Sequence, residues 1–262
     1  MRHGFIDQYS DLDSFIHRLD PRTRILTTLA FVLAVVATPP PAWPAFALQA
    51  ILIASLILLA RLPPLYALKR SVVILPFVLM IAIFIPFLEQ GEVAGSYNIW
   101  LWQVSVTYDG LIVLWNVLVK SWLSALGLIL LSATTPFPRL LKGLERLGVP
   151  QVMVMILSFM YRYIFVLADE AMRMQRARDS RNFGGRWSWQ VRTIGNMLGT
   201  LFIRSYERGE RVYGAMVARG FDGEIRTLSD LRFGRTDLGF GVVFSISLVA
   251  IGLITIWRMG LP

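Results

Sequence analysis

The sequence predicts an all-α polytopic membrane protein, and three observations lead to this fold class. Of the 262 residues, 55% are hydrophobic, and the mean hydropathy is +0.58, so a water-soluble domain could not cover its apolar surface. Several apolar runs approach the ~20 residues with which a helix crosses a bilayer. The net charge of +9 is concentrated in residues 137–236, which hold 17 basic and 9 acidic residues, a balance of +8.

The apolar runs are separated by prolines and by charge. Four lie early in the chain and one at its end, at residues 25–38, 42–60, 72–88, 110–131 and 238–257. The prolines at 39–41 end the first run because proline cannot continue a helix. Basic residues precede the first run (Arg22, Arg24) and the third (Arg61, Lys69, Arg70), and the positive-inside rule places them in the cytoplasm together with the N-terminus.

Residues 89–108 hold two acidic residues and no basic one, which predicts an external loop. Within this loop, residues 98–106 alternate in part between apolar and polar side chains. This pattern is typical of a short hairpin or of an interfacial aromatic patch.

Residues 151–168 are apolar enough to cross the membrane, but a crossing there would place most of the basic stretch outside. Arg162 lies in the middle, where an unpaired arginine facing lipid costs at least ~2.5 kcal/mol. We therefore expect about five transmembrane helices around a cytoplasmic insert of amphipathic helices, with 151–168 buried in protein or lying at the inner interface. Six spans with a re-entrant hairpin are the alternative. The expected divisions are 1–136, 137–236 and 237–262.

Lys120 falls within the fourth apolar run, where a lysine suggests a functional role. The structural alternative is that Lys120 snorkels to the interface or faces Asn116 inside the bundle.

The insert contains three predicted helices, at about 137–147, 151–182 and 188–219, with Gly148 and Gly220 as stop signals. Ala177-Arg178-Asp179 and Ala218-Arg219-Gly220 lie at the ends of the two long helices, with their arginines 41 residues apart. The helix dipole alone explains one arginine at such a position. Two motifs on consecutive helices indicate attachment to a partner, because the guanidinium is a rigid fork suited to carboxylates and carbonyls.

Several kinds of chemistry are excluded or disfavoured. There is no cysteine, and the two histidines, His3 and His17, lie near the N-terminus, so thiolate metal sites and a Ser-His-Asp triad are not expected. The chain has no phosphate-binding glycine loop, and its basic residues are interrupted by acids, which argues against nucleic acid. We expect no catalytic residue, no cofactor and no metal site, and read the methionines at 153, 155, 160, 172 and 174 as adaptable packing.

With these motifs the chain resembles the transmembrane T component of energy-coupling factor (ECF) transporters, and its N-terminal residues are most similar to the cobalt-uptake CbiQ subfamily. The second motif matches the family pattern of Ala-Arg-Gly, whereas Asp179 stands in place of glycine in the first. The flanking matches are His17-Arg-Leu-Asp-Pro-Arg-Thr-Arg24, Thr134-Thr-Pro136 and Met216-Val-Ala-Arg-Gly-Phe-Asp222.

The resemblance implies a non-catalytic subunit of an ATP-driven importer in the plasma (inner) membrane. Its partners would be two cytoplasmic ABC-type ATPases and a small membrane subunit that captures the substrate. The residues implied to dock the ATPases are Ala177, Arg178, Asp179, Ala218, Arg219 and Gly220. The cargo implied by the subfamily is the cobalt ion, with nickel or a vitamin as alternatives.

Two other classes remain alternatives from the residues alone. A membrane-embedded enzyme, such as a lipid phosphotransferase, would need clustered aspartates, and Asp169-Glu170, Asp179 and Asp222 lack metal-ligand spacing. A protein insertase would use Lys120 in a polar groove.

Overall fold

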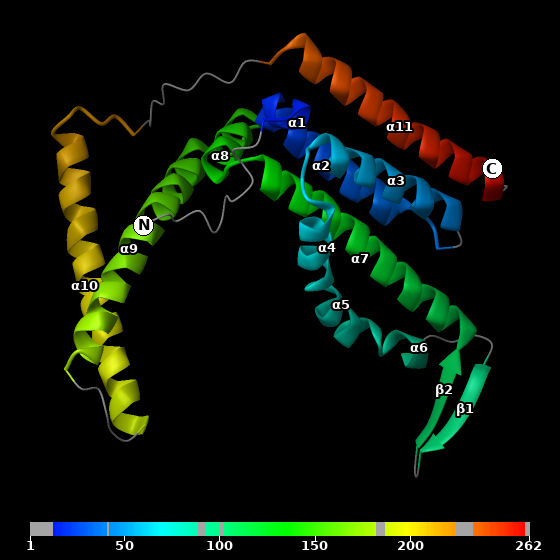
Figure 1. Ribbon diagram of the computed structural model, residues 1–262, viewed down its shortest axis with the longest axis horizontal. Helices are drawn as coiled ribbons and strands as arrows, with labels where there is room; N and C mark the ends of the chain where they lie inside the picture. The colour runs from blue at the N-terminus through cyan, green and yellow to red at the C-terminus, as the bar shows by residue number, and fades with distance from the viewer. Residues whose placement is uncertain are drawn as a thin grey trace. The chain divides into compact units, whose positions relative to one another are not determined.

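The computed structural model describes residues 13–40, 42–88, 93–99, 102–181, 187–223 and 233–259. The chain divides into two compact units (Figure 1). The membrane unit contains Gly4–Gly143 and Leu231–Pro262, and the second unit contains Leu144–Asp230.

The membrane unit is built from apolar helices. In chain order they are α1 (Phe15–Arg18), α2 (Pro21–Ala37), α3 (Trp43–Leu59), α4 (Pro64–Val72), α5 (Leu75–Ala82), α6 (Ile85–Leu88), α7 (Tyr108–Thr134) and α11 (Arg235–Met259). α2 begins with a good start signal, because the Asp20 side chain accepts a hydrogen bond from the Arg22 backbone N–H and Pro21 occupies the first helical position. The first, second, fourth and last apolar runs are each confirmed as one helix.

The third apolar run differs from the expectation of a single helix over 72–88. The helix starts earlier, at Pro64, so Lys69 and Arg70 lie inside it, and it is broken into α4, α5 and α6. Pro76 and Pro86 explain both breaks. A proline ring clashes with the carbonyl four residues before it, and α4 and α5 end at those positions, Val72 and Ala82.

Of the two alternatives for residues 98–106, the structure shows the hairpin. β1 (Val93–Ile99) and β2 (Trp102–Thr107) pair antiparallel, with Ile99 opposite Trp102 at the turn end. The pair precedes α7 directly and contacts both α6 and α7. A small β element thus closes one end of an otherwise helical unit.

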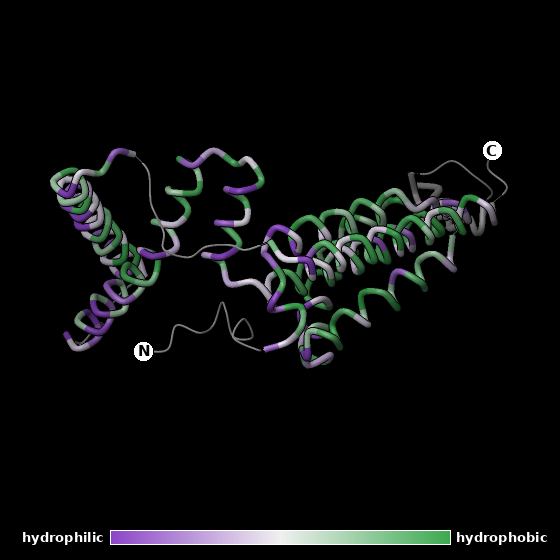
Figure 2. The backbone as a smooth tube through the Cα atoms, turned by 90° about the horizontal axis from the view of Figure 1, so that it is seen from above, coloured by the Kyte–Doolittle hydropathy of each residue, from purple (hydrophilic) through white to green (hydrophobic). Residues whose placement is uncertain are grey.

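The core of the membrane unit lies where α2, α3, α7 and α11 meet. Its buried side chains include Phe31, Val35, Leu123 and Phe244. Gly127 brings α7 close to α2, since a Cβ there would lie 3.1 Å from the Phe31 ring. The outer faces of the same helices carry exposed large apolar side chains, and the tube in Figure 2 is largely hydrophobic along them. Exposed apolar surface of this extent is suited to lipid.

Lys120 has a structural role that neither sequence interpretation described. Its Nζ donates to the Val36 carbonyl oxygen at 2.9 Å, at the C-terminal end of α2. Asn116 instead bonds the Ile112 carbonyl of its own helix. A cation that satisfies a free carbonyl at a helix C-terminus also interacts favourably with the helix dipole.

The second unit holds the long helices α9 (Gln151–Asp179) and α10 (Trp187–Val217), which contact each other. α8 (Phe137–Arg146) leads into it and ends at Gly148, whose φ of 101° closes the helix as expected. Within the part of the chain that the structure describes, four helical segments are long and apolar enough to cross a membrane: 64–82, 108–134, 151–179 and 235–257, with α3 apolar but shorter. The non-spanning assignment of 151–168 remains a prediction.

Candidate functional site

The first Ala-Arg motif forms the last turn of α9. Arg178 turns back on its neighbour, with its Nε and Nη2 donating to Asp179 Oδ1 at 2.9 and 2.8 Å. The Arg178 side chain is only 18% exposed, and that of Asp179 is 53% exposed. The aspartate that replaces the family's glycine therefore holds the guanidinium in place.

The second motif forms the C-terminal cap of α10. The Phe221 N–H bonds the Met216 carbonyl and the Gly220 N–H bonds the Val217 carbonyl, both at 3.0 Å. Gly220 has a φ of 80°, and this bond pattern is a Schellman motif with Gly220 at the C′ position, as predicted. Arg219 is the exposed cap residue, and its guanidinium has no hydrogen bond or ion pair within the described residues. The two arginines thus differ, one paired and one free.

An ion-pair cluster joins the two long helices. Glu170 on α9 accepts from Arg204 on α10 at 2.6 Å and from Arg173 on its own helix at 2.8 Å. The hydrogen bond from Arg204 holds the pKa of the Glu170 carboxyl below its ordinary value. Glu207 and Arg211 on α10, one helical turn apart, pair at 3.7 Å.

Both long helices also carry rows of exposed apolar side chains at helical spacing. The row on α9 is Met153, Ile156, Met160 and Ile164, and the row on α10 is Val191, Ile194, Leu198 and Phe202. Each of these side chains is at least 43% exposed. Rows of this kind are typical of helices that pack against a partner.

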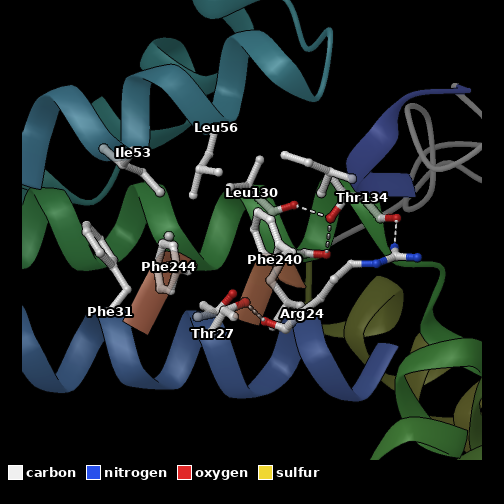
Figure 3. Close-up of a pocket in the computed structure, with 13 residues that line it drawn as sticks. Arg24, Thr27, Phe31, Ile53, Leu56, Leu130, Thr134, Phe240 and Phe244 are labelled. Atoms are coloured by element: carbon white, nitrogen blue, oxygen red, sulfur yellow. Dashed lines mark hydrogen bonds between the residues drawn. The ribbon is translucent and has the colours of Figure 1, made fainter. Parts of the chain in front are cut away.

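Arg24 joins two family-like segments of the membrane unit that lie far apart in the sequence. Its side chain is buried, and it donates to the carbonyls of His17, at 2.9 Å, and Leu19, at 3.1 Å. It also donates to the Thr134 carbonyl, as Figure 3 shows at the end of α7, and to Thr135 Oγ1 at 3.0 Å. The start of α2 and the end of α7 are thereby locked together.

Asp20 and Asp237 extend this junction to α11. The Asp20 N–H donates to Asp237 Oδ1 at 2.6 Å, and Asp237 Oδ2 accepts from the Gly234 N–H at 2.9 Å. On the other side, α8 packs tightly, since a Cβ on Gly143 would lie 3.0 Å from Ile25 and 3.1 Å from Pro21. The segments that enter and leave the second unit are therefore anchored at the same end of the membrane unit.

Sequence reasoning missed this junction. One signal was available: Arg24 lies in the first turn or so of a helix, where the dipole disfavours a cation. An arginine at such a position needs acceptors from elsewhere in the chain.

A small cavity lies beside Arg24. It has a volume of about 30 Å³, enough for about one water, and the apolar side chains of Phe31, Ile53, Leu130 and Phe244 line it (Figure 3). No group of three or more metal-ligating His, Asp or Glu side chains occurs among the described residues.

The fold defines a multi-pass helical membrane protein whose two long helices carry both ion pairs and exposed apolar side chains. The chain belongs to the CbiQ family, described as cobalt transport protein, which matches residues 13–228. It is therefore a membrane transport component.

Relatives carry similar names. The energy-coupling factor transporter transmembrane protein EcfT of Acidaminococcus fermentans is 30% identical, over 98% of this chain and 97% of that protein. EcfT of Thermosediminibacter oceani is 29% identical, over 97% of this chain and 98% of its own. A putative fused cobalt transport protein, CbiMQ, of Methanocorpusculum labreanum is 28% identical, over 76% of this chain and 34% of its own length. These names describe transport subunits, in agreement with the expectation of a non-catalytic chain.

Proposed function

We propose that this chain is the scaffold subunit of an ECF-type importer, which transmits the movement of two ABC-type ATPases to a small membrane subunit that captures the substrate. The observation that carries this proposal is the position of the two Ala-Arg motifs, each at the C-terminal end of a long helix of the second unit. The EcfT relatives, aligned over nearly their whole length, support it.

Each arginine is suited to dock in a groove of one ATPase. Arg219 offers a free fork of donors, and Gly220 beside it has no side chain to obstruct a close approach. Arg178 is held by Asp179, so docking there requires the carboxylate to be shared or released. With two motifs and two ATPases, each ATPase would bind one motif.

The link between the helices supports a coupled movement. Because Glu170 bonds Arg204, a force on the end of either helix reaches the other. The two apolar rows would face the capture subunit, and the methionines of the α9 row can adapt their packing as that subunit moves.

We assign the cargo to the cobalt ion on the strength of the family description, with nickel or a vitamin as the competing substrates. Selection of the cargo would lie in the capture subunit. The orientation we propose places the N-terminus and residues 137–236 in the cytoplasm. The names of the relatives favour transport over the enzyme and insertase alternatives.

The test is affinity purification of the tagged chain from its own membranes, followed by mass spectrometry. The proposal expects two ATPase subunits, or two copies of one, and a small membrane protein. Ribosomes or nascent chains instead would support an insertase, and a chain purified without partners that turns over lipid would support an enzyme. Uptake of radioactive cobalt, with nickel as competitor, then tests the cargo.

A further inference from the structure

The start of α2 is tied to both chain segments that connect the membrane unit with the second unit. Leu144–Asp230 continues into the membrane unit at each of its ends. On the outgoing side, Arg24 ties α2 to the end of α7, because it donates to the Thr134 carbonyl and to Thr135 Oγ1. On the returning side, Asp237 ties α11 to the same place. A movement of the second unit that pulls on its two ends therefore acts on these ties.

The two carboxylate oxygens of Asp237 have separate roles. Oδ2 accepts from the Gly234 N–H at 2.9 Å, which is the return bond that an acidic side chain in the first turn makes to the cap of its own helix. Oδ1 accepts from the Asp20 N–H at 2.6 Å, 217 residues away in the sequence. Helix capping needs only the first of these bonds. The second fixes the start of α11 on the turn that begins α2.

Burial prevents water from replacing the bond between Asp20 and Asp237. Each of these residues is only 5% exposed. Without the Asp237 carboxylate, the Asp20 N–H would be a buried donor that has lost its acceptor, which is costly. The bond is also charge-assisted, and such bonds are roughly twice as strong as those between neutral groups. The tie is therefore a strong one.

An apolar contact also holds α11 near its start, but it acts differently. About one turn beyond Asp237, the Phe240 ring meets Phe15 of α1 edge-on, with 6.2 Å between the ring centroids. Apolar contacts have no preferred direction, whereas a hydrogen bond weakens steeply when its angle changes. The aromatic contact therefore keeps α11 close to its neighbours and still permits sliding. The bond of Asp237 fixes the position of α11 relative to α2.

We propose that Asp237 is a positioning residue for energy coupling, whose bond to Asp20 makes the starts of α11 and α2 move as one body. The inference rests on the proposed function, because it concerns how movement of the ATPases reaches the membrane helices. With the tie intact, a pull on the returning connection moves α2 and, through Arg24, the end of α7. Without the tie, the start of α11 shifts alone. ATPase docking stays intact, because Arg178 and Arg219 belong to the second unit.

The first test compares transport with ATP hydrolysis in the complete complex, with radioactive cobalt as the probe. Asp237→Ala should keep the co-purified ATPases and their hydrolysis of ATP, whereas cobalt uptake per ATP should fall about tenfold or more, because a charge-assisted bond is lost.

A second variant separates the tie from the cap of α11, since Asp237→Ala removes both bonds. In Asp237→Ala/Gly234→Ser the serine restores a cap without restoring the bond to Asp20. The serine has room, because the nearest atom to a Cβ on Gly234 is Asp237 Oδ2, at 3.4 Å. Uptake per ATP should stay low in this variant. Recovery to the level of the unsubstituted chain would show that only the cap matters and would overturn the proposal.

Gln49→Ala is the matched control for the loss of a buried polar bond. Gln49 is 2% exposed and donates to Thr38 Oγ1 at 2.9 Å, at the opposite end of α2. This variant should lower the melting temperature but leave uptake per ATP unchanged. An equal fall in uptake per ATP in Gln49→Ala and Asp237→Ala would mean that general loosening explains the effect, which would overturn the proposal. If no ATPase co-purifies with the unsubstituted chain, the proposed function itself fails.

A second measurement follows the movement itself and needs no cargo. Spin labels are attached to cysteines in place of Leu26 on α2 and Leu238 on α11, which are 50% and 58% exposed, in a chain that has no cysteine of its own. In the complex with its ATPases in nanodiscs, the distance between the labels should be the same with and without the ATP analogue AMP-PNP. In Asp237→Ala/Gly234→Ser, AMP-PNP should change that distance. A distance that responds to AMP-PNP with Asp237 in place, or in neither protein, would contradict the tie.

Discussion

Three arginines of this chain differ in how many hydrogen-bond donors of the guanidinium group are already used within the protein. All the hydrogen bonds of Arg24 go to acceptors within the membrane unit, so its role is structural. Arg219 has no partner in the described residues, and Arg178 is held by the adjacent carboxylate of Asp179. We assign these two arginines, Arg219 and Arg178, to ATPase docking.

The first prediction concerns Asp179. Asp179→Gly should strengthen ATPase binding by about 1.4- to 5-fold, because a partly exposed ion pair worth ~0.2–1 kcal/mol no longer competes for Arg178. Binding of the purified ATPases to the chain in nanodiscs measures the change, and Asp179→Glu, which keeps the charge, is the control. Weaker binding of the glycine variant would show that the carboxylate assists docking.

The second prediction concerns Arg24. Arg24→Ala leaves the Thr134 and His17 carbonyls without their donor, which should lower the free energy of unfolding by at least ~2 kcal/mol. Arg18→Ala, which removes only an exposed pair with Asp13 at 2.7 Å, should cost less than ~1 kcal/mol. Thermal unfolding in detergent compares the two. Equal losses would mean that the Arg24 bonds add no stability beyond that of a surface pair.

At the scale of elements, the sequence predicted the helix ends that depend on adjacent residues, but not the contacts between residues far apart in the chain. Gly148 and Gly220 end their helices as expected, because a C-terminal cap depends on a few adjacent residues. The bond from Arg24 to Thr134 joins residues 110 positions apart, and no periodicity marks it. The start of α4 was misplaced because the apolar run was counted only from residue 72, after Lys69 and Arg70, whereas these two residues belong to the helix that begins at Pro64.

The third prediction concerns the cap of α10. Gly220→Ala should destabilise the cap by about 1–2 kcal/mol, since a residue with a Cβ disfavours a left-handed conformation such as the φ of 80° here. Gly214→Ala is the matched control: it lies inside α10 with nothing within 4 Å of the added Cβ, and should be neutral or stabilising. Hydrogen exchange at residues 216–221 reports the cap. Equal protection in the two variants would contradict the Schellman assignment.

The fourth prediction concerns the link between α9 and α10. Glu170→Gln should speed hydrogen exchange in α10 around Arg204 at neutral pH, because the charge-assisted bond is lost. The pKa of Glu170 is lowered, so the stabilisation is present above its ordinary value and is lost as the pH falls through the lower one. The variant should lack this acid-dependent loosening. If the variant and the wild type exchange alike at neutral and at acidic pH, the Glu170–Arg204 pair does not couple α9 to α10.

At the scale of the whole molecule, the account makes a prediction about membrane topology. The charge of residues 137–236 predicts a cytoplasmic location, although 151–179 is long and apolar enough to span. The chain has no cysteine of its own, so single cysteines give a clear signal. Cysteines at Arg173, Ser188 and Arg226, the last outside the described residues, should resist an impermeant thiol reagent applied to intact cells. Labelling of all three from outside would refute five spans.

The most direct test of the coupling mechanism is the amount of ATPase that co-purifies with Arg178→Ala, Arg219→Ala and the double variant, at equal membrane expression. Loss of a buried, hydrogen-bonded charge at an interface typically costs ~2–5 kcal/mol, so each single change should weaken the complex and the double change should release most of the ATPase. Lysine should rescue poorly because it lacks the planar fork. Arg192→Ala, an exposed arginine near the start of α10, should leave assembly intact. Full ATPase recovery and full transport by the double alanine variant would contradict the account.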